Sequence, residues 1–134
     1  MPNIDLALVV GNPGEDREKV VAALLKYGMG SICCSSLEDA RTLLRQEAFG
    51  VVLCRDNLSD GDFREALREV TRSTVHVPVI VLSHDADWDT YLKALGAGAF
   101  DVIVCPPDVV ETKRILLSAV AATGWTEEIA HSVA

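Results

Sequence analysis

Five short apolar runs divide this chain and limit the folds available to it. The runs cover residues 4–10, 31–34, 51–54, 77–82 and 100–104. They are rich in valine and isoleucine and do not alternate with polar residues, which is typical of strands buried on both faces of a parallel sheet. The segments between the runs carry apolar residues at helical spacing, as at positions 63, 66, 67 and 70. We therefore expect an α/β fold.

Five strand–helix units joined by right-handed crossovers form an open parallel sheet with helices on both faces. For five strands we predict a flavodoxin-like, doubly wound (βα)5 sheet with the strand order 2-1-3-4-5. We expect a single domain over residues 1–134, in which residues 123–134 form a C-terminal tail. Trp125 in this tail either frays with it or folds back onto the body.

Capping patterns indicate where three helices begin. Asn12 stands before Pro13 and Gly14, Ser36 stands three residues before Asp39, and Asp108 stands three residues before Glu111. A polar side chain at such a position accepts a hydrogen bond from a free amide of the first turn, and the acidic residue lies at the positive end of the helix dipole. The apolar stripes of the helices, including positions 88, 91, 92 and 95 and position 110, are expected to pack into the core.

The charge balance excludes several classes of protein. The chain has 12 lysines and arginines against 20 aspartates and glutamates, a net charge of −8. No basic surplus is available to neutralise phosphates, which argues against nucleic-acid binding. No uncharged apolar run approaches the roughly 18 residues of a membrane span, and the first ten residues lack the basic start of a signal peptide. We expect an acidic cytoplasmic domain that binds neither membranes nor nucleic acid.

The four cysteines favour buried, reduced thiols. Cys33 and Cys34 are adjacent, Cys54 and Cys105 end apolar runs, and no C-x-x-C pair has the spacing of a metal site. A metal held by Cys54, Cys105 and His84 would lack a fourth ligand, and a Cys105–His84 nucleophile pair would lack an orienting acid. We predict neither a metal nor a catalytic residue. Positions 76 and 131, both histidine, are expected to lie in a loop and in the tail.

Three segments follow the expected strands at the sheet edge where such folds bind ligands. They are LCRDNLSDGDF at 53–63, VIVLS at 79–83 and GAFDVIVCPPD at 98–108. Together with the βα spacing over residues 4–122, they resemble the response-regulator receiver domain of two-component phosphorelay signalling. In that family an Asp after the third strand accepts a phosphoryl group, and two acids after the first strand help to hold Mg²⁺. A Ser or Thr and a Lys bind the phosphoryl oxygens.

Most of these family positions hold other residues in this chain. Gly11 and Asn12 replace the acid pair, Arg55 replaces the phosphoacceptor, and Cys105 replaces the Lys. His84 replaces a small residue, Phe63 replaces the loop glycine, and Val102 replaces the aromatic residue of the fifth strand; Ser83 keeps its family identity. A guanidinium cannot accept a phosphoryl group and repels a divalent cation. We interpret these positions as the degenerate phosphoacceptor pocket of a pseudo-receiver that has no cofactor and does not bind Mg²⁺.

Three alternatives stay open. Asp56 could act as a displaced phosphoacceptor, although a shift of one residue at a strand end turns a side chain the other way. Arg55 could bind a small anion together with Ser83. We favour instead a structural ion pair between Arg55 and one of the nearby carboxylates, which are Asp56, Asp60, Asp62 and Asp85. An unrelated flavodoxin-like enzyme is the third alternative.

The resemblance implies that this non-enzymatic domain acts by protein–protein interaction. Receivers bind partners or dimerise through the face formed by the fourth helix, the fifth strand and the fifth helix. In this chain that face would be built from residues 88–98, 100–105 and 108–120. We expect a protein partner or a second copy of the chain there.

Overall fold

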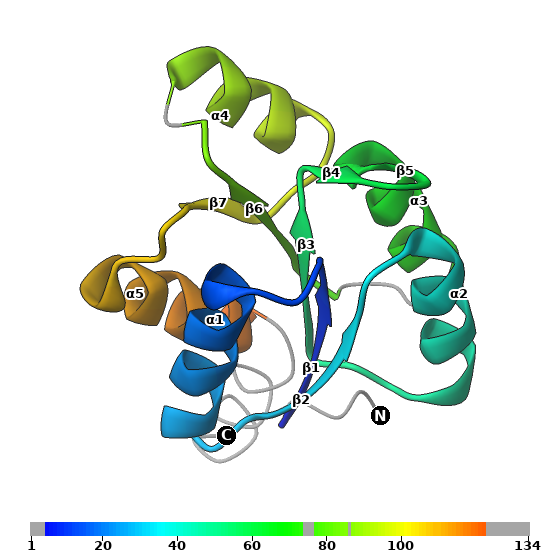
Figure 1. Cartoon of the computed structure of the whole chain (residues 1–134), viewed down its shortest axis with the longest axis horizontal. Coiled ribbons are helices and arrows are strands. Elements are labelled where there is room, and N and C mark those ends of the chain that lie inside the picture. Colours follow the sequence, from blue (N-terminus) through cyan, green and yellow to red (C-terminus); the bar gives the residue numbers. More distant parts are fainter. Residues whose placement is uncertain (1–4, 74–76, 86, 123–134) are drawn as a thin grey trace, which may run out of the picture.

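The computed structural model describes residues 5–73, 77–85 and 87–122. A five-stranded parallel sheet in the order β2-β1-β3-β6-β7 runs through it (Figure 1). The strands are β1 (Leu6–Val10), β2 (Gly30–Cys34), β3 (Val51–Arg55), β6 (Val79–Ser83) and β7 (Asp101–Val104). Counted along the sheet strands alone, this is the predicted order 2-1-3-4-5, and the flavodoxin-like fold is confirmed.

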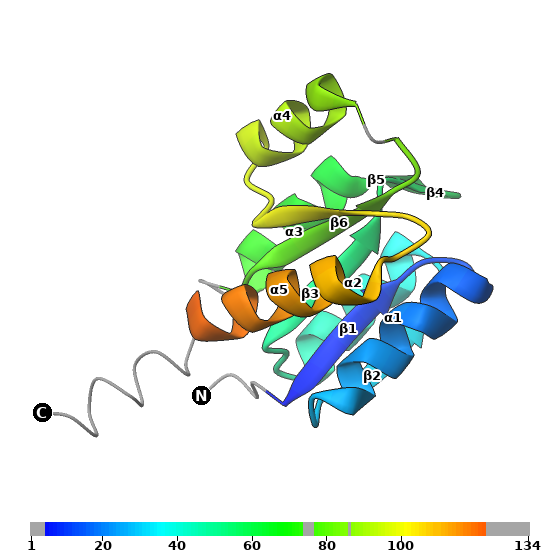
Figure 2. The ribbon, with the colours of Figure 1, turned by 90° about the vertical axis from the view of Figure 1, so that its left-hand side faces the viewer.

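Five helices cover the two faces of the sheet (Figures 1 and 2). They are α1 (Glu15–Lys26), α2 (Leu37–Gln46), α3 (Phe63–Ser73), α4 (Trp88–Gly96) and α5 (Val109–Val120). Because side chains alternate along each strand, Leu8 and Val52 pack with α2 and α3 on one face, whereas Val9 and Leu53 pack with α1 and α5 on the other. The central strands are therefore buried on both faces, as their continuous apolar sequence predicts.

Two of the three predicted helix starts are confirmed. The Ser36 hydroxyl accepts a hydrogen bond from the amide of Asp39 at 3.1 Å, and the Asp108 carboxylate accepts one from the amide of Glu111 at 2.9 Å. The prediction at Asn12 is wrong, because α1 begins only at Glu15 and its N-cap residue is Gly14, which provides no side-chain cap. Residues 12–14 instead form the loop that leads from β1 into the helix.

A small hairpin between β3 and α3 was not predicted. It consists of β4 (Asn57–Leu58) paired antiparallel with β5 (Gly61–Asp62). At its turn the Asp60 carboxylate accepts hydrogen bonds from the amides of Leu37, at 2.9 Å, and Glu38, at 3.1 Å. These two bonds lower the pKa of Asp60 below its usual value. The hairpin therefore caps the start of α2 from outside that helix.

The expectation that the apolar helix stripes enter the core is wrong for α4 and for the start of α5. Trp88 is 70% exposed, Leu92 is 49% exposed and Val110 is 74% exposed. The helix α4 covers the edge strand β7 and buries mainly Ala94. Among the described residues, no neighbouring helix covers its outer apolar side chains.

Two further observations concern the whole described chain. The four cysteines are free thiols, of which Cys33 is partly exposed and the other three are buried. None of the helices in the described ranges is long and apolar enough to cross a membrane. The predictions for Trp125, for the tail at 123–134 and for the histidines at 76 and 131 lie outside the described residues.

Candidate functional site

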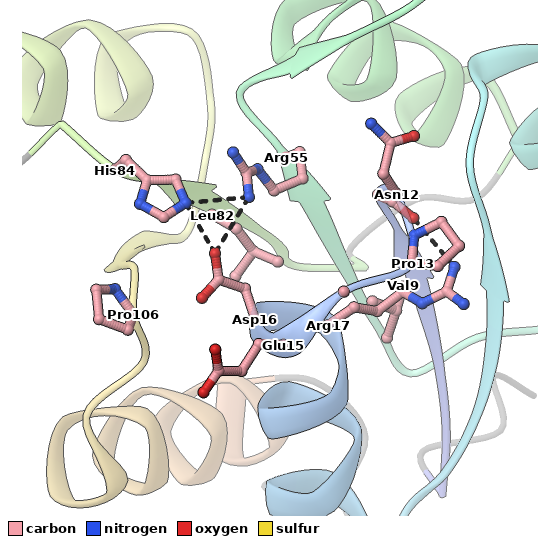
Figure 3. Close-up of a pocket in the computed structure, with 12 residues that line it drawn as sticks. Val9, Asn12, Pro13, Glu15, Asp16, Arg17, Arg55, Leu82, His84 and Pro106 are labelled. Atoms are coloured by element: carbon pink, nitrogen blue, oxygen red, sulfur yellow. Dashed lines mark hydrogen bonds and ion pairs between the residues drawn. The ribbon is translucent and has the colours of Figure 1, made fainter.

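The carboxyl ends of the central strands bring most of the predicted site residues to one edge of the sheet. Gly11 follows β1, Arg55 ends β3, Ser83 ends β6, and Cys105 follows β7. A hollow of about 420 Å³ opens there (Figure 3). It is lined by Val9, Gly11, Asn12, Pro13, Gly14, Glu15, Asp16, Arg17, Arg55, Leu82, His84 and Pro106.

Arg55 extends its guanidinium into this hollow toward the first turn of α1. Its Nη1 atom lies 3.4 Å from Oδ2 of Asp16, and its Nε atom lies 4.0 Å from Oδ1 of Asp56. Within the described part of the chain, the buried Nε of Arg55 has no hydrogen-bond partner. An ion pair for Arg55 was predicted, but its main partner was not among the carboxylates considered. Asp60 and Asp62 hold helix amides instead.

Asp16 is the residue that joins the two sides of the hollow. Its Oδ2 atom lies 2.8 Å from Nε2 of His84 as well as 3.4 Å from Arg55 (Figure 3). The short distance places a proton on Nε2 of His84, because the carboxylate can only accept. The Nε2 and Nη1 atoms, 3.4 Å apart, are then two donors that share one carboxylate oxygen. The trio connects α1, β3 and the loop after β6.

Gly11 leaves the space through which the Arg55 side chain passes. A Cβ atom at position 11 would lie 2.7 Å from Cγ of Arg55 and 3.7 Å from its Cδ. A distance of 2.7 Å between two non-bonded carbon atoms is too short, so a side chain at position 11 would force the Arg55 side chain to shift. Gly11 and Arg55 are thus two parts of one packing arrangement.

Ser83 and Asp56 form a second pair beside the trio. The buried Ser83 hydroxyl donates to Oδ2 of Asp56 at 2.8 Å and accepts from the amide of Asp85 at 3.0 Å. The other oxygen of Asp56 accepts from the amide of Asn57 at 3.0 Å. This contact between Ser83 and Asp56 was not expected. The strand ends at Arg55, so Asp56 no longer follows the alternation that would turn it away.

The remaining predicted site residues contribute no charge. Cys105 is buried, its amide donates to the carbonyl of Ser83 at 2.8 Å, and a cis peptide bond joins it to Pro106. Burial raises the pKa of the Cys105 thiol to about 11, so the thiol is neutral near pH 7. Asn12 is exposed on the rim of the hollow.

Two charged residues of the site were missed in the sequence. Asp16 binds Arg55 and His84, and Arg17 donates through Nη1 to the carbonyl of Gly11 at 3.2 Å. Both belong to the first turn of α1, where acidic residues are common because they offset the helix dipole. Only the assembled fold distinguishes Asp16 from Glu15 and Glu18. The sequence nevertheless carried one indication of a site. Asp16 closely follows the first expected strand, and ligands bind at the carboxyl ends of the strands in such folds.

The described residues contain no group of three histidine, cysteine, aspartate or glutamate side chains that could hold a metal ion. At the centre of the hollow the positive charge belongs to the chain itself, on Arg55, and the Asp16 carboxylate balances it. Chemically, this arrangement offers an ion pair between Arg55 and Asp16 that also contacts His84.

The strand order and the helices on both faces of the sheet are those of a signalling receiver fold. The sequence pattern of the response regulator receiver domain family matches residues 8–117, so the chain belongs to that family.

Relatives at the sequence level are regulators of greater length. The response regulator protein PilR of Pseudomonas aeruginosa is 26% identical over 113 residues, which cover 84% of this chain and 25% of PilR. The regulatory protein AtoC of Escherichia coli K12 is 28% identical over 131 residues, covering 98% of this chain and 28% of AtoC. The chain therefore spans about a quarter of the length of these curated relatives.

Solved structures of receiver domains share the fold. The beryllofluoride-activated NtrC4 receiver domain dimer superposes with a TM-score of 0.79 at 21% identity, covering 87% of this chain and 97% of the other. NtrX from Brucella abortus superposes with a TM-score of 0.83 at 20% identity, covering 96% of this chain and 29% of the other.

Proposed function

We propose that this chain is a receiver domain that acts without phosphoryl transfer, as a protein-interaction module. The observation that carries the proposal is Arg55, which stands at the phosphoacceptor position of the family. Its guanidinium is ion-paired to Asp16 inside the strand-end hollow. Arginine stays protonated and cannot act as a nucleophile. The internal ion pair supplies the charge balance that a metal and a phosphoryl group supply in other receivers.

Metal binding at this hollow is disfavoured by charge and by geometry. Gly11 and Asn12 provide no carboxylate, and Mg²⁺ is usually bound through one or two carboxylates. The Asp16 carboxylate faces the hollow, but one of its oxygens already contacts the guanidinium and the imidazole. A cation there would have to displace Arg55, which argues for a receiver without Mg²⁺.

The contact between Ser83 and Asp56 favours one rival, in which Asp56 accepts the phosphoryl group. Ser83 keeps its family identity, and its hydroxyl lies 2.8 Å from Oδ2 of Asp56. Against this rival, both oxygens of Asp56 already accept hydrogen bonds, and the Arg55 side chain occupies the neighbouring space. We therefore assign Asp56 the structural role of holding the loops after β3 and β6 together.

Acetyl phosphate with Mg²⁺ is the direct test. We expect intact-mass spectrometry to find no phosphoryl adduct after incubation, because the position of the family's phosphoacceptor holds Arg55, which cannot act as a nucleophile. A receiver domain with the complete set of acids serves as the positive control. Stoichiometric labelling that disappears in Asp56→Asn but persists in the matched variant Asp62→Asn would overturn the proposal.

The interaction surface we propose is an apolar face built by α4, β7 and α5. Figure 2 shows β7 at the edge of the sheet between these two helices. The exposed apolar side chains of this face are Trp88, Leu92, Val104, Val110 and Leu117. Trp88 also stacks on Tyr91, with ring centroids 5.4 Å apart, which presents a rigid aromatic anchor of the kind that dominates interface energies.

We propose a second copy of the chain as the occupant of this apolar face. A receiver domain of the same fold, NtrC4, forms a dimer. The edge strand β7 ends the sheet within this face, so a copy placed there covers apolar side chains that no other described element covers.

A further inference from the structure

Five arginines lie on the outer surface of α2 and α3, two helices that pack side by side (Figure 1). They are Arg41 and Arg45 on α2 and Arg64, Arg68 and Arg72 on α3, and we call them the arginine surface. The whole chain has 12 lysines and arginines and a net charge of −8. A large share of its positive charge is therefore gathered on one pair of helices.

Helix stability does not explain this arrangement. Each set repeats at intervals of four residues, so the guanidinium groups of one helix share a face and repel each other. Arg45 and Arg72 lie in last turns, where the dipole favours a cation. Arg64, in contrast, is the second residue of α3, where the dipole opposes a cation, and Arg68 gains nothing from either end.

Few acids within the described residues compensate the arginine surface. The half-buried Glu69 is shared, because its Oε1 atom lies 2.9 Å from Nε of Arg41 and 3.7 Å from Nη1 of Arg72. Arg45 and Arg68 are exposed and have no ion-pair partner in the described ranges. Their charged groups are therefore free to bind a partner without breaking an internal contact.

The surface is hollowed where these arginines stand. One hollow, of about 690 Å³, is lined by Arg41, Leu44, Arg45, Glu69 and Arg72. A second, of about 280 Å³, is lined by Arg64, Leu67, Arg68, Thr71, Arg72 and Ala97. Arg72 lines both hollows, so they adjoin at this side chain, and each also contains a leucine, Leu44 in the first and Leu67 in the second.

We propose that the arginine surface binds an acidic segment of a partner protein. Guanidinium forks match carboxylates geometrically, and Leu44 and Leu67 line the two hollows beside the arginines. Nucleic acid fits less well, because no aromatic side chain lines either hollow for base stacking. This surface is separate from the strand-end hollow and from the apolar face, so it does not depend on the proposed function.

The test is an NMR titration of the ¹⁵N-labelled chain with a short synthetic oligoglutamate peptide at low salt. We expect shift changes confined to α2 and α3. In the double variant Arg45→Gln/Arg68→Gln the dissociation constant should rise about fivefold or more, since each exposed ion pair contributes a modest amount. These two side chains have no ion pair to lose, so the variant should fold as the parent does.

A matched control removes the same charge from another surface. The variant Lys26→Gln/Lys113→Gln, on α1 and α5, should bind the peptide within about twofold of the parent, the effect of weak long-range screening alone. The proposal is overturned if the lysine variant loses as much affinity as the arginine variant, or if no peaks of α2 and α3 move. It is also overturned if a short oligothymidylate binds this surface more tightly than the peptide, which would identify a nucleic-acid site instead.

Discussion

At the residue scale, the candidate site depends on the fit between Arg55 and Gly11. A glycine has no side chain, so the Arg55 side chain can pass Gly11 at the end of β1 and reach Asp16 on α1. The site therefore has a packing constraint as well as a charge constraint. An acidic side chain placed at position 11 would therefore clash with Arg55.

Gly11→Ala tests this constraint. The added Cβ would lie 2.7 Å from Cγ of Arg55, so we expect a loss of stability of about 1–3 kcal/mol, the usual cost of overpacking. Chemical denaturation measures it. In an Arg55→Ala background, adding Gly11→Ala should lower the stability much less than it does in the parent, because the clashing Cγ atom of Arg55 is gone.

The matched control is Gly96→Ala. A Cβ at position 96 meets nothing within 4 Å, and alanine favours a helix, so this variant should be as stable as the parent or slightly more stable. If Gly11→Ala and Gly96→Ala have the same stability, the proposed fit between Gly11 and Arg55 is refuted.

At the scale of elements, the β4–β5 hairpin, which follows β3 in the chain, is hydrogen-bonded to the start of α2. The Asp60 carboxylate accepts two hydrogen bonds from amides of α2, and the hydroxyl of Ser36, the N-cap residue of α2, accepts a third. A Cβ at Gly61 would collide with Cδ1 of Leu37, so the hairpin can approach α2 only with glycine there. The loop after the strand that carries Arg55 is thereby held against a neighbouring helix.

The pKa of Asp60 makes this contact sensitive to acid. Because the folded chain lowers the pKa of Asp60, the carboxylate contributes stability that is complete above the unfolded value, near 3.9, and is lost as pH falls through the folded value. The parent should therefore have a higher melting temperature than Asp60→Asn, and this difference should decrease below about pH 4.

The variant Asp60→Asn cannot accept at both amides of α2, so its melting temperature should be lower than that of the parent at pH 7. The difference should shrink toward pH 3, where the aspartate of the parent becomes protonated. Asp89→Asn removes a carboxylate that forms an exposed ion pair with Lys93 in the first turn of α4, and it should lower the melting temperature less than Asp60→Asn does. If the difference in melting temperature between Asp60→Asn and the parent is the same at pH 3 and pH 7, the assigned role of Asp60 is contradicted.

At the scale of the whole molecule, charge and apolar surface are separated. The arginine surface lies on α2 and α3, whereas the exposed apolar side chains gather on α4, β7 and α5. The helices α2 and α3 flank the middle of the sheet, and β7 forms one of its edges. The molecule thus offers two different surfaces for contact, one electrostatic and one apolar.

The apolar face predicts self-association. We expect sedimentation velocity to show a monomer–dimer equilibrium that depends on concentration, and Trp88→Glu to shift it toward the monomer by at least about tenfold, as for an aromatic interface anchor. Leu25→Glu is the control, since Leu25 on α1 is 71% exposed but lies outside the apolar face. A parent chain that stays monomeric at millimolar concentration would rule out a second copy as the occupant.

Several features of this protein followed from the sequence alone. The apolar runs predicted the strands and their order, because burial on both faces requires continuous apolar residues and right-handed crossovers leave few topologies. The cap residues Ser36 and Asp108 were also predictable, since their hydrogen bonds close within one helical turn. The same local logic identified Arg55 and Ser83 at strand ends.

Contacts between distant elements were decided only by the tertiary structure. Asp16, 39 residues before Arg55, was one acid among several in a first helical turn, and nothing local marked it as the partner. Trp88 and Val110 fit helical stripes as well as buried residues do, but the edge position of β7 leaves them uncovered. Periodicity reports which side chains share a helix face, whereas only the packed sheet determines whether another element covers that face.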